Sequence, residues 1–194
     1  MSKHHLTTRL HPLIEDNSSV GVGGAITTYL ARIPEMTLGD TRNGVTFKGF
    51  EGGLKQAQKG SGFDPKSKDI AGSIGTRTLQ HFTVTFDYGH RKLYLVKNKN
   101  FDAPFPMLRH GFTAPFGGAE HAVLSVMPNS PAAEAGMSVG DKIVSVDGVT
   151  YESKNLDAVR ARLRQPAGMV VEIVIVPKGG GEKRSLKPTL RDLL

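Results

Sequence analysis

The stretch from Ser130 to Gly148, SPAAEAGMSVGDKIVSVDG, constrains the fold of this chain more than any other part of the sequence. Ser130 is a helix N-cap candidate, and Pro131 suits the first helical position because its missing N–H has no helical partner there. Gly136 suits the left-handed position that follows a last helical turn. An apolar run then ends at Asp147-Gly148, a typical turn pair. The spacing therefore predicts a short helix, a strand and a tight turn, in that order.

The sequence around this stretch predicts further strands and one longer helix. Residues 155–164 form the helix, because Leu156, Val159 and Leu163 recur on one face and Pro166 and Gly168 follow. The expected strands are 122–126, 142–146, 169–176 and 184–190. The glycines 179–181 join the last two strands as a hairpin loop and lack the spacing of a phosphate-binding loop.

The ordered set SPAAEAG, then GD, then a strand that ends in DG resembles the signature of bacterial PDZ domains. The resemblance covers residues 107–190 and implies a domain that binds extended or C-terminal peptide segments by adding them to a sheet edge. It also implies that the motif itself is mainly structural, since its glycines occupy turns and its alanines let the short helix pack closely.

The same resemblance assigns candidate peptide-binding residues. The loop that would receive a peptide carboxylate is His110, Gly111, Phe112 and Thr113, and the groove wall is residues 155–164, with Val159 and Leu163 facing the peptide. Periodicity alone equally allows Val159 and Leu163 to be core residues. Arg109 is the nearest cation, and we interpret it as a solvated surface arginine rather than a carboxylate ligand.

Upstream, the sequence predicts strands and loops in a separate domain. Residues 33–38 and 45–50 form one hairpin, whose Asn43-Gly44 supplies the positive φ of the turn, and residues 83–88 and 92–96 form a second. Residues 1–19 are a polar tail, residues 51–69 are a surface loop, and the domain boundary lies near Pro106. The fold class is mainly β with a few short helices.

Residues 20–104 resemble part of a retropepsin-like aspartyl protease lobe. The resemblance rests on residues 70–88, IAGSIGTRTLQHFTVTFDY, and implies a strand at Ile74-Gly75, then a short helix and a hairpin that close the lobe. A PDZ domain after such a lobe is a known bacterial arrangement.

The catalytic turn of that family, a hydrophobic residue followed by Asp-Thr/Ser-Gly, is absent from the sequence. Such turns supply paired carboxylates that share a proton and activate water. Asp40-Thr41 is followed by Arg42, where the tight turn requires glycine, and Asp16-Asn17-Ser18 lacks the glycine as well. By alignment of parts the turn would precede Met1, so we expect the C-terminal portion of a protease lobe, and no catalytic residue is assigned.

Composition excludes several other classes of function. The 194 residues contain no cysteine, which rules out thiolate chemistry and Cys-ligated metals. The net charge of +7 is divided between two mildly basic halves, with 14 basic and 9 acidic groups in residues 1–104 and 11 and 9 in residues 105–194. These charges form no stripe with aromatic residues, so no nucleic-acid partner is expected. His4, His5 and His11 lie in a polar tail without carboxylates at ligand spacing, and we expect neither a metal nor a cofactor.

Three hypotheses follow from these observations. The first is a peptide-binding chain without catalysis, and the second is an aspartic-type endopeptidase whose catalytic Asp lies upstream or in a partner lobe. The third is a structural adaptor that oligomerises through open strand edges, either as a homodimer or with a second lobe. The sequence has neither a signal peptide nor a membrane span, and it leaves the compartment, the peptide specificity and the question of enzymatic activity open.

Overall fold

The computed structural model describes residues 10, 13–21, 24–39, 42–55, 73–105, 107–115 and 121–194. The fold is mainly β with a few short helices, as the sequence predicts. The chain divides into two compact units, one of residues Ala57–Pro106 and the other of residues Met1–Gln56 with Met107–Leu194.

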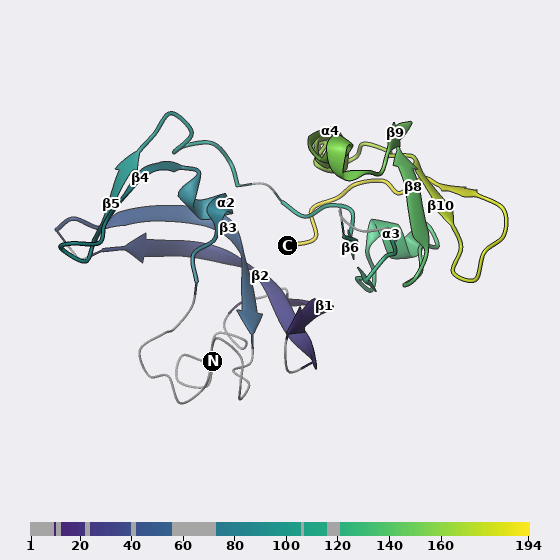
Figure 1. Ribbon diagram of the computed structural model, residues 1–194, viewed down its shortest axis with the longest axis horizontal. Helices are drawn as coiled ribbons and strands as arrows, with labels where there is room; N and C mark the ends of the chain where they lie inside the picture. The colour runs from purple at the N-terminus through teal and green to yellow at the C-terminus, as the bar shows by residue number, and fades with distance from the viewer. Residues whose placement is uncertain are drawn as a thin grey trace. The chain divides into compact units, whose positions relative to one another are not determined.

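The first three strands form an antiparallel sheet in the order β1-β2-β3 (Figure 1). Their bounds are β1 (Leu13–Gly21), β2 (Gly24–Leu38) and β3 (Val45–Lys55). Leu38 pairs with Val45, which confirms the predicted hairpin, although both strands are longer than predicted. In the described part of its turn the positive φ, +100°, lies at Gly39 and not at Asn43 or Gly44.

Two predictions about loops are wrong in part. Residues 13 to 19 were expected in a polar tail, yet they belong to β1, which pairs with β2 through the backbone and needs no apolar periodicity of its own. Residues 51 to 55 were expected in a surface loop, yet they continue β3. The remainder of that loop, the polar tail before residue 10 and the Asp40-Thr41 pair lie outside the described residues.

The unit Ala57–Pro106 contains α2 (Thr76–Leu79) and an antiparallel hairpin of β4 (Phe82–Asp87) and β5 (Lys92–Lys97). The short helix and the hairpin were predicted, whereas the strand at Ile74-Gly75 was not found. Gly75 is the N-cap of α2, and the side chain of Ile74 is 40% exposed. Phe86 and Tyr88 stack with ring centroids 6.1 Å apart while remaining exposed, so this face of the hairpin buries little.

The C-terminal region contains two small sheets and three helical segments around one core (Figure 1). The sheets have the orders β6-β7 and β11-β10-β8-β9. The element bounds are β6 (Phe112–Thr113), β7 (Ser125–Val126), α3 (Pro131–Glu134), β8 (Lys142–Val146), β9 (Val149–Thr150), the 3-10 helix η1 (Ser153–Asn155), α4 (Leu156–Leu163), β10 (Ile173–Val176) and β11 (Arg184–Leu186). The predicted order of elements is confirmed, with shorter strands than expected at β7, β10 and β11.

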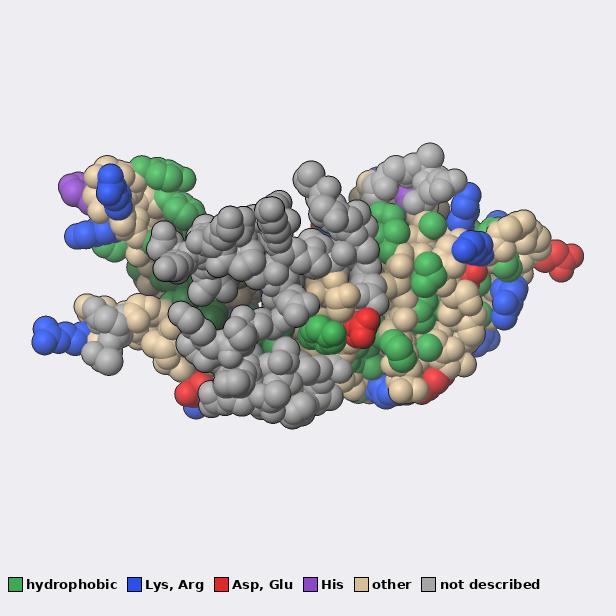
Figure 2. All heavy atoms as spheres, turned by 90° about the horizontal axis from the view of Figure 1, so that it is seen from below, with side chains coloured by type: hydrophobic (Ala, Val, Ile, Leu, Met, Phe, Trp, Pro, Cys, Tyr) green, Lys and Arg blue, Asp and Glu red, His purple; other side chains and the backbone are tan. Residues whose placement is uncertain are grey.

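The surface of the described residues carries scattered cations. On the face shown in Figure 2, Lys and Arg side chains are spread among uncharged ones and form no continuous stripe. In the described part of the chain, no helix is long and apolar enough to cross a membrane.

The first Asp of the GD…DG pattern is a buried structural anchor. Asp141 is 4% exposed, and its carboxylate accepts hydrogen bonds from the backbone N–H groups of Ser138 (2.8 Å) and Lys178 (3.0 Å). Each of these donors would be costly to leave without an acceptor away from water. Asp141 therefore joins the loop before β8 to the end of β10.

The second Asp of the pattern joins the turn after β8 to the segment before β10. Asp147 has a φ of +45°, which a residue with a Cβ seldom adopts. Its carboxylate accepts from the N–H of Glu172 (2.8 Å) and from Nε2 of Gln165 (3.2 Å), and its own N–H donates to the Glu172 carbonyl at 2.8 Å. These contacts hold the turn, so both Asp residues are explained by structure.

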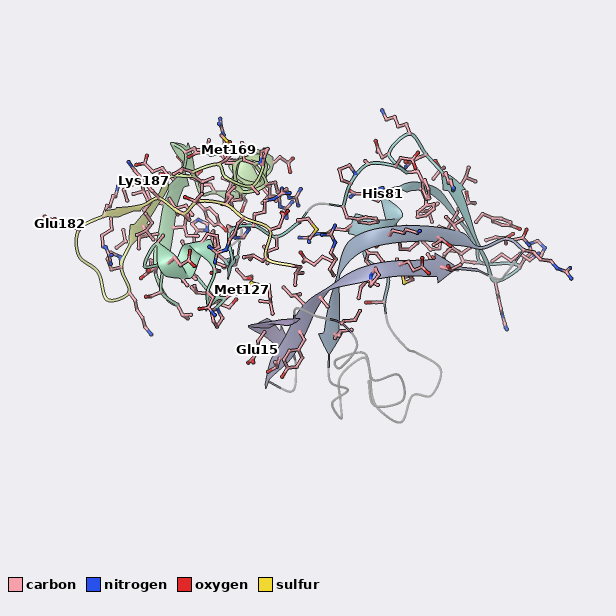
Figure 3. All side chains as sticks on the ribbon, turned by 180° about the vertical axis from the view of Figure 1, so that it is seen from behind. Glu15, His81, Met127, Met169, Glu182 and Lys187 are labelled. Atoms are coloured by element: carbon pink, nitrogen blue, oxygen red, sulfur yellow. The ribbon has the colours of Figure 1, made fainter. Side chains whose placement is uncertain are left out.

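Replacement of Asp141 by Ala should lower the free energy of unfolding by about 2 kcal/mol, because two partly buried N–H groups lose their acceptor. Asp141→Asn should cost less, since its carbonyl oxygen still accepts one bond. Urea denaturation of the full chain measures both. Glu182→Ala is the matched control, because Glu182 lies exposed on the loop between β10 and β11 (Figure 3) and should change stability by less than about 0.5 kcal/mol. Equal effects of Asp141→Ala and Glu182→Ala would contradict the anchoring role.

Candidate functional site

The candidate carboxylate-binding loop, residues 110–113, leads into β6 and is held from two sides. Gly111 has a φ of +80°, and its carbonyl accepts hydrogen bonds from the N–H of Met127 (2.8 Å) and from the hydroxyl of Ser130 (3.2 Å). The His110 carbonyl accepts from the N–H of Ala132 at 3.0 Å. The loop is therefore attached to the beginning of α3.

Ser130 performs two tasks at this attachment. It is the N-cap of α3, as predicted, and its hydroxyl accepts from the N–H of Ala133 at 3.3 Å while donating to Gly111. A Cβ on Gly111 would lie 2.1 Å from the Cβ of Ser130 and 2.4 Å from its hydroxyl oxygen. Only glycine fits this position without displacing the buried Ser130.

One backbone N–H group of this loop already donates a hydrogen bond to a side chain of the same loop. The N–H of Phe112 donates to Nδ1 of His110 at 3.3 Å, and the two rings lie with centroids 4.4 Å apart. A ligand oxygen that took this N–H would replace the imidazole nitrogen.

The predicted groove residues come together in the core. Phe112, Val159 and Leu163 belong to one cluster of buried side chains and are 2%, 0% and 4% exposed. The helical periodicity that placed Val159 and Leu163 on one face is confirmed, and the face is an interior one. Their side chains belong to the buried core to which β6 and α4 both contribute.

Arg109 does not behave as a solvated surface arginine, so that interpretation is wrong. Its side chain is 21% exposed, and its Nε donates to the carboxylate of Asp192 at 2.6 Å. Its Nη1 lies 3.4 Å from the carbonyls of Arg164 and Gln165, which follow α4. The sequence did not indicate this partner, because 83 residues separate the two side chains.

A second arginine links the C-terminal segment that contains Asp192 to α3 through an ion pair. Both Nη atoms of Arg191 donate to the carboxylate of Glu134, at 2.7 Å and 2.8 Å, and one also donates to the carbonyl of Asn129. This bidentate pair lowers the pKa of Glu134 below its ordinary value. Glu134 thus serves as a counter-ion, a role that its position in the motif did not reveal.

No metal-binding cluster is present among the described residues. His4, His5 and His11 lie outside them. His81, a buried histidine of the other unit, donates from Nδ1 to the carbonyl of Asn100 at 2.6 Å and therefore has a structural partner.

Comparison with known proteins identifies the class of this region. Residues 123–177 match the family model for the PDZ domain, so this part of the chain is a PDZ domain. A curated relative, the carboxyl-terminal-processing protease of Synechocystis sp., is 35% identical over 57 residues, which cover 29% of this chain and only 13% of that protein.

Two solved structures are also similar. The photosystem II D1 C-terminal processing protease is 29% identical with a TM-score of 0.41, and the match covers 46% of this chain and 24% of that chain. A serine endoprotease from Yersinia pestis is 12% identical with a TM-score of 0.41, over 95% of this chain and 63% of that chain.

The resemblance of residues 20–104 to a retropepsin-like lobe is not supported by these comparisons. The family match lies wholly within the C-terminal region, and the name of the curated relative does not make it an aspartyl protease. The PDZ part of the resemblance is confirmed.

Gly111→Ala should destabilise the chain more than Gly148→Ala. Both glycines have positive φ, +80° and +75°, so both substitutions carry a backbone cost of about 1 to 2 kcal/mol. Only at Gly111 does the new Cβ overlap another residue, and we expect about 1 to 3 kcal/mol more there. Urea denaturation measures the difference, and Ser130→Gly in the Gly111→Ala background should recover the steric part. Equal losses at the two glycines would contradict the close packing on Ser130.

The Glu134–Arg191 pair should make stability depend on acid pH. Because the folded-state pKa of Glu134 is lowered, its contribution is present above the ordinary value of 4.5 and is lost as pH falls through the folded-state pKa. The urea midpoint of the wild type should therefore fall more between pH 6 and pH 3 (about 1.5 units on either side of the ordinary carboxyl pKa of glutamate) than that of Glu134→Gln. Asp87, whose pKa is also lowered by hydrogen bonds from His90, titrates equally in both proteins. Parallel pH profiles would contradict the pairing.

Proposed function

We propose that this chain binds extended peptide segments, those with a C-terminal carboxylate above all, at the edge of β6 beside α4. The observation that carries the proposal is the PDZ match over residues 123–177, together with a preceding glycine loop that Ser130 holds in place. Within the described residues β6 pairs with β7 alone, so its other edge has backbone groups available for a peptide strand.

In the proposed complex, the peptide backbone continues the β6-β7 ladder and its carboxylate meets the loop of His110, Gly111, Phe112 and Thr113. The N–H of Phe112 would exchange its bond with His110 Nδ1 for one with the carboxylate, which as an ionised acceptor makes the stronger hydrogen bond. Phe112, Val159 and Leu163 are buried in the core, so for the last peptide side chain to pack against them, as the groove assignment proposes, the side chains that cover them would have to move.

We propose no catalytic step for the residues of this chain. The Asp-Thr/Ser-Gly turn of aspartic proteases is absent from the sequence. The alternative, an aspartic-type endopeptidase completed by residues outside this chain, finds no support in the comparisons. The curated relative is named a protease, but the match covers only 13% of it, so its activity does not transfer to this chain.

The test uses fluorescence polarisation of the full chain with a library of labelled decapeptides. We expect micromolar binding of peptides that end in an apolar residue with a free carboxylate, and a loss of at least about tenfold when the C-terminus is amidated, because a charge-assisted bond is removed. N-methylation at alternate peptide positions should abolish binding, whereas methylation at the positions between should not, because only alternate N–H groups face β6.

Mass spectrometry of the same mixtures should show intact peptides. No saturable binding to any peptide, or binding that ignores N-methylation at every position, would overturn the proposed function. Peptide cleavage that a transition-state mimic of aspartic proteases inhibits would overturn the absence of catalysis.

A further inference from the structure

The Arg109–Asp192 ion pair lies beside the proposed carboxylate loop. Arg109 immediately precedes His110, and its guanidinium bridges the carboxylate of Asp192 and the carbonyls of Arg164 and Gln165 that follow α4. Those carbonyls lie at the negative end of the helix. The cation closest in sequence to the loop is therefore already engaged by a carboxylate of the same chain.

The neighbours of Asp192 hold it in this place. Leu190 is fully buried, its N–H donates to the Met169 carbonyl (2.8 Å), and its carbonyl accepts from the N–H of Gly168 (2.7 Å). Arg191 is tied to Glu134 through its side chain, and its N–H donates to the Arg109 carbonyl at 3.4 Å. In Figure 1 the yellow end of the chain accordingly runs back towards β6.

The next residue brings an apolar side chain to the loop. A Cβ built on Gly111 would lie 3.5 Å from Cδ1 of Leu193, so this half-buried leucine is in van der Waals range of the loop. Residues 191–193 thus present a carboxylate and an adjoining apolar side chain at the loop. A bound peptide with an apolar C-terminal residue would present the same two groups.

We propose that residues 191–193 form an intramolecular competitor that restrains peptide binding, with the Asp192 carboxylate holding Arg109 until a ligand carboxylate displaces it. This inference rests on the proposed function. The Asp192 side chain is 48% exposed, and ion pairs of such exposure are weak, so a ligand can displace it. The tether compensates for this weakness, because a competitor on the same chain acts at a high effective concentration.

The experiment compares the full-length wild type with Asp192→Asn, Glu182→Gln and Arg109→Gln in the peptide-binding assay. Glu182→Gln removes the same charge from the exposed loop between β10 and β11 (Figure 3) and is the matched control. Asp192→Asn should bind carboxylate peptides about three- to fivefold more tightly, which is the range expected for removal of an exposed pair. Glu182→Gln should bind like the wild type.

Arg109→Gln should bind carboxylate peptides more weakly, and adding Asp192→Asn to it should bring no gain, because the competitor has lost its partner. In the wild type, an NMR contact between Leu193 methyl protons and Gly111 should disappear on saturation with peptide. Amidated peptides should not distinguish Asp192→Asn from the wild type.

Each outcome decides one of the two proposals. If no variant binds any peptide, the proposed function fails and the inference fails with it. If the wild type and Asp192→Asn bind equally, the inference fails while the function stands. Equal gains in peptide affinity for Asp192→Asn and Glu182→Gln would mean that net charge causes the effect. This result would also overturn the proposed intramolecular competition.

Discussion

The contact between Ser130 and Gly111 is the constraint on which the candidate site depends. One hydroxyl caps α3 and at the same time donates to the carbonyl of Gly111 in the loop that leads into β6. Because the Gly111 backbone lies directly against the Ser130 side chain, the loop cannot move away from α3 without exposing a buried helix end. The helix and the loop therefore form one rigid support for the edge of β6.

This contact explains why the recognisable motif and the proposed binding residues lie apart in the sequence. The motif residues Ser130, Asp141 and Asp147 accept backbone N–H groups and hold turns, and they are the buried frame of the domain. The residues proposed to meet the carboxylate of a ligand precede the motif by about twenty positions, at Arg109 to Thr113. A match to the motif consequently identifies the fold, whereas the function must be argued from the loop that the fold supports.

The C-terminal region could be predicted closely because its signals are local. A cap, a proline and a left-handed glycine bracket α3 within seven residues, and the Asp147-Gly148 turn ends β8. In contrast, β1 was missed, since it is held by pairing with the long strand β2 and not by its own apolar pattern. The Arg109–Asp192 pair was missed for the same kind of reason, because its partners meet only after the whole domain has folded.

The engagement of Arg109 changes how the loop must be understood. An unpaired cation beside a glycine loop would attract any carboxylate. A cation that is already paired binds a ligand carboxylate only when that interaction is more favourable than the one with its own partner. Leu190 is buried in the core and Arg191 is paired with Glu134. Because these two residues precede Asp192 directly, folding of the core places Asp192 beside Arg109. In the proposed competition, stability of the C-terminal segment and restraint of the loop are thus linked. A ligand would gain access to Arg109 without disturbing the buried Leu190, because only the half-exposed Asp192 and the half-buried Leu193 would have to move.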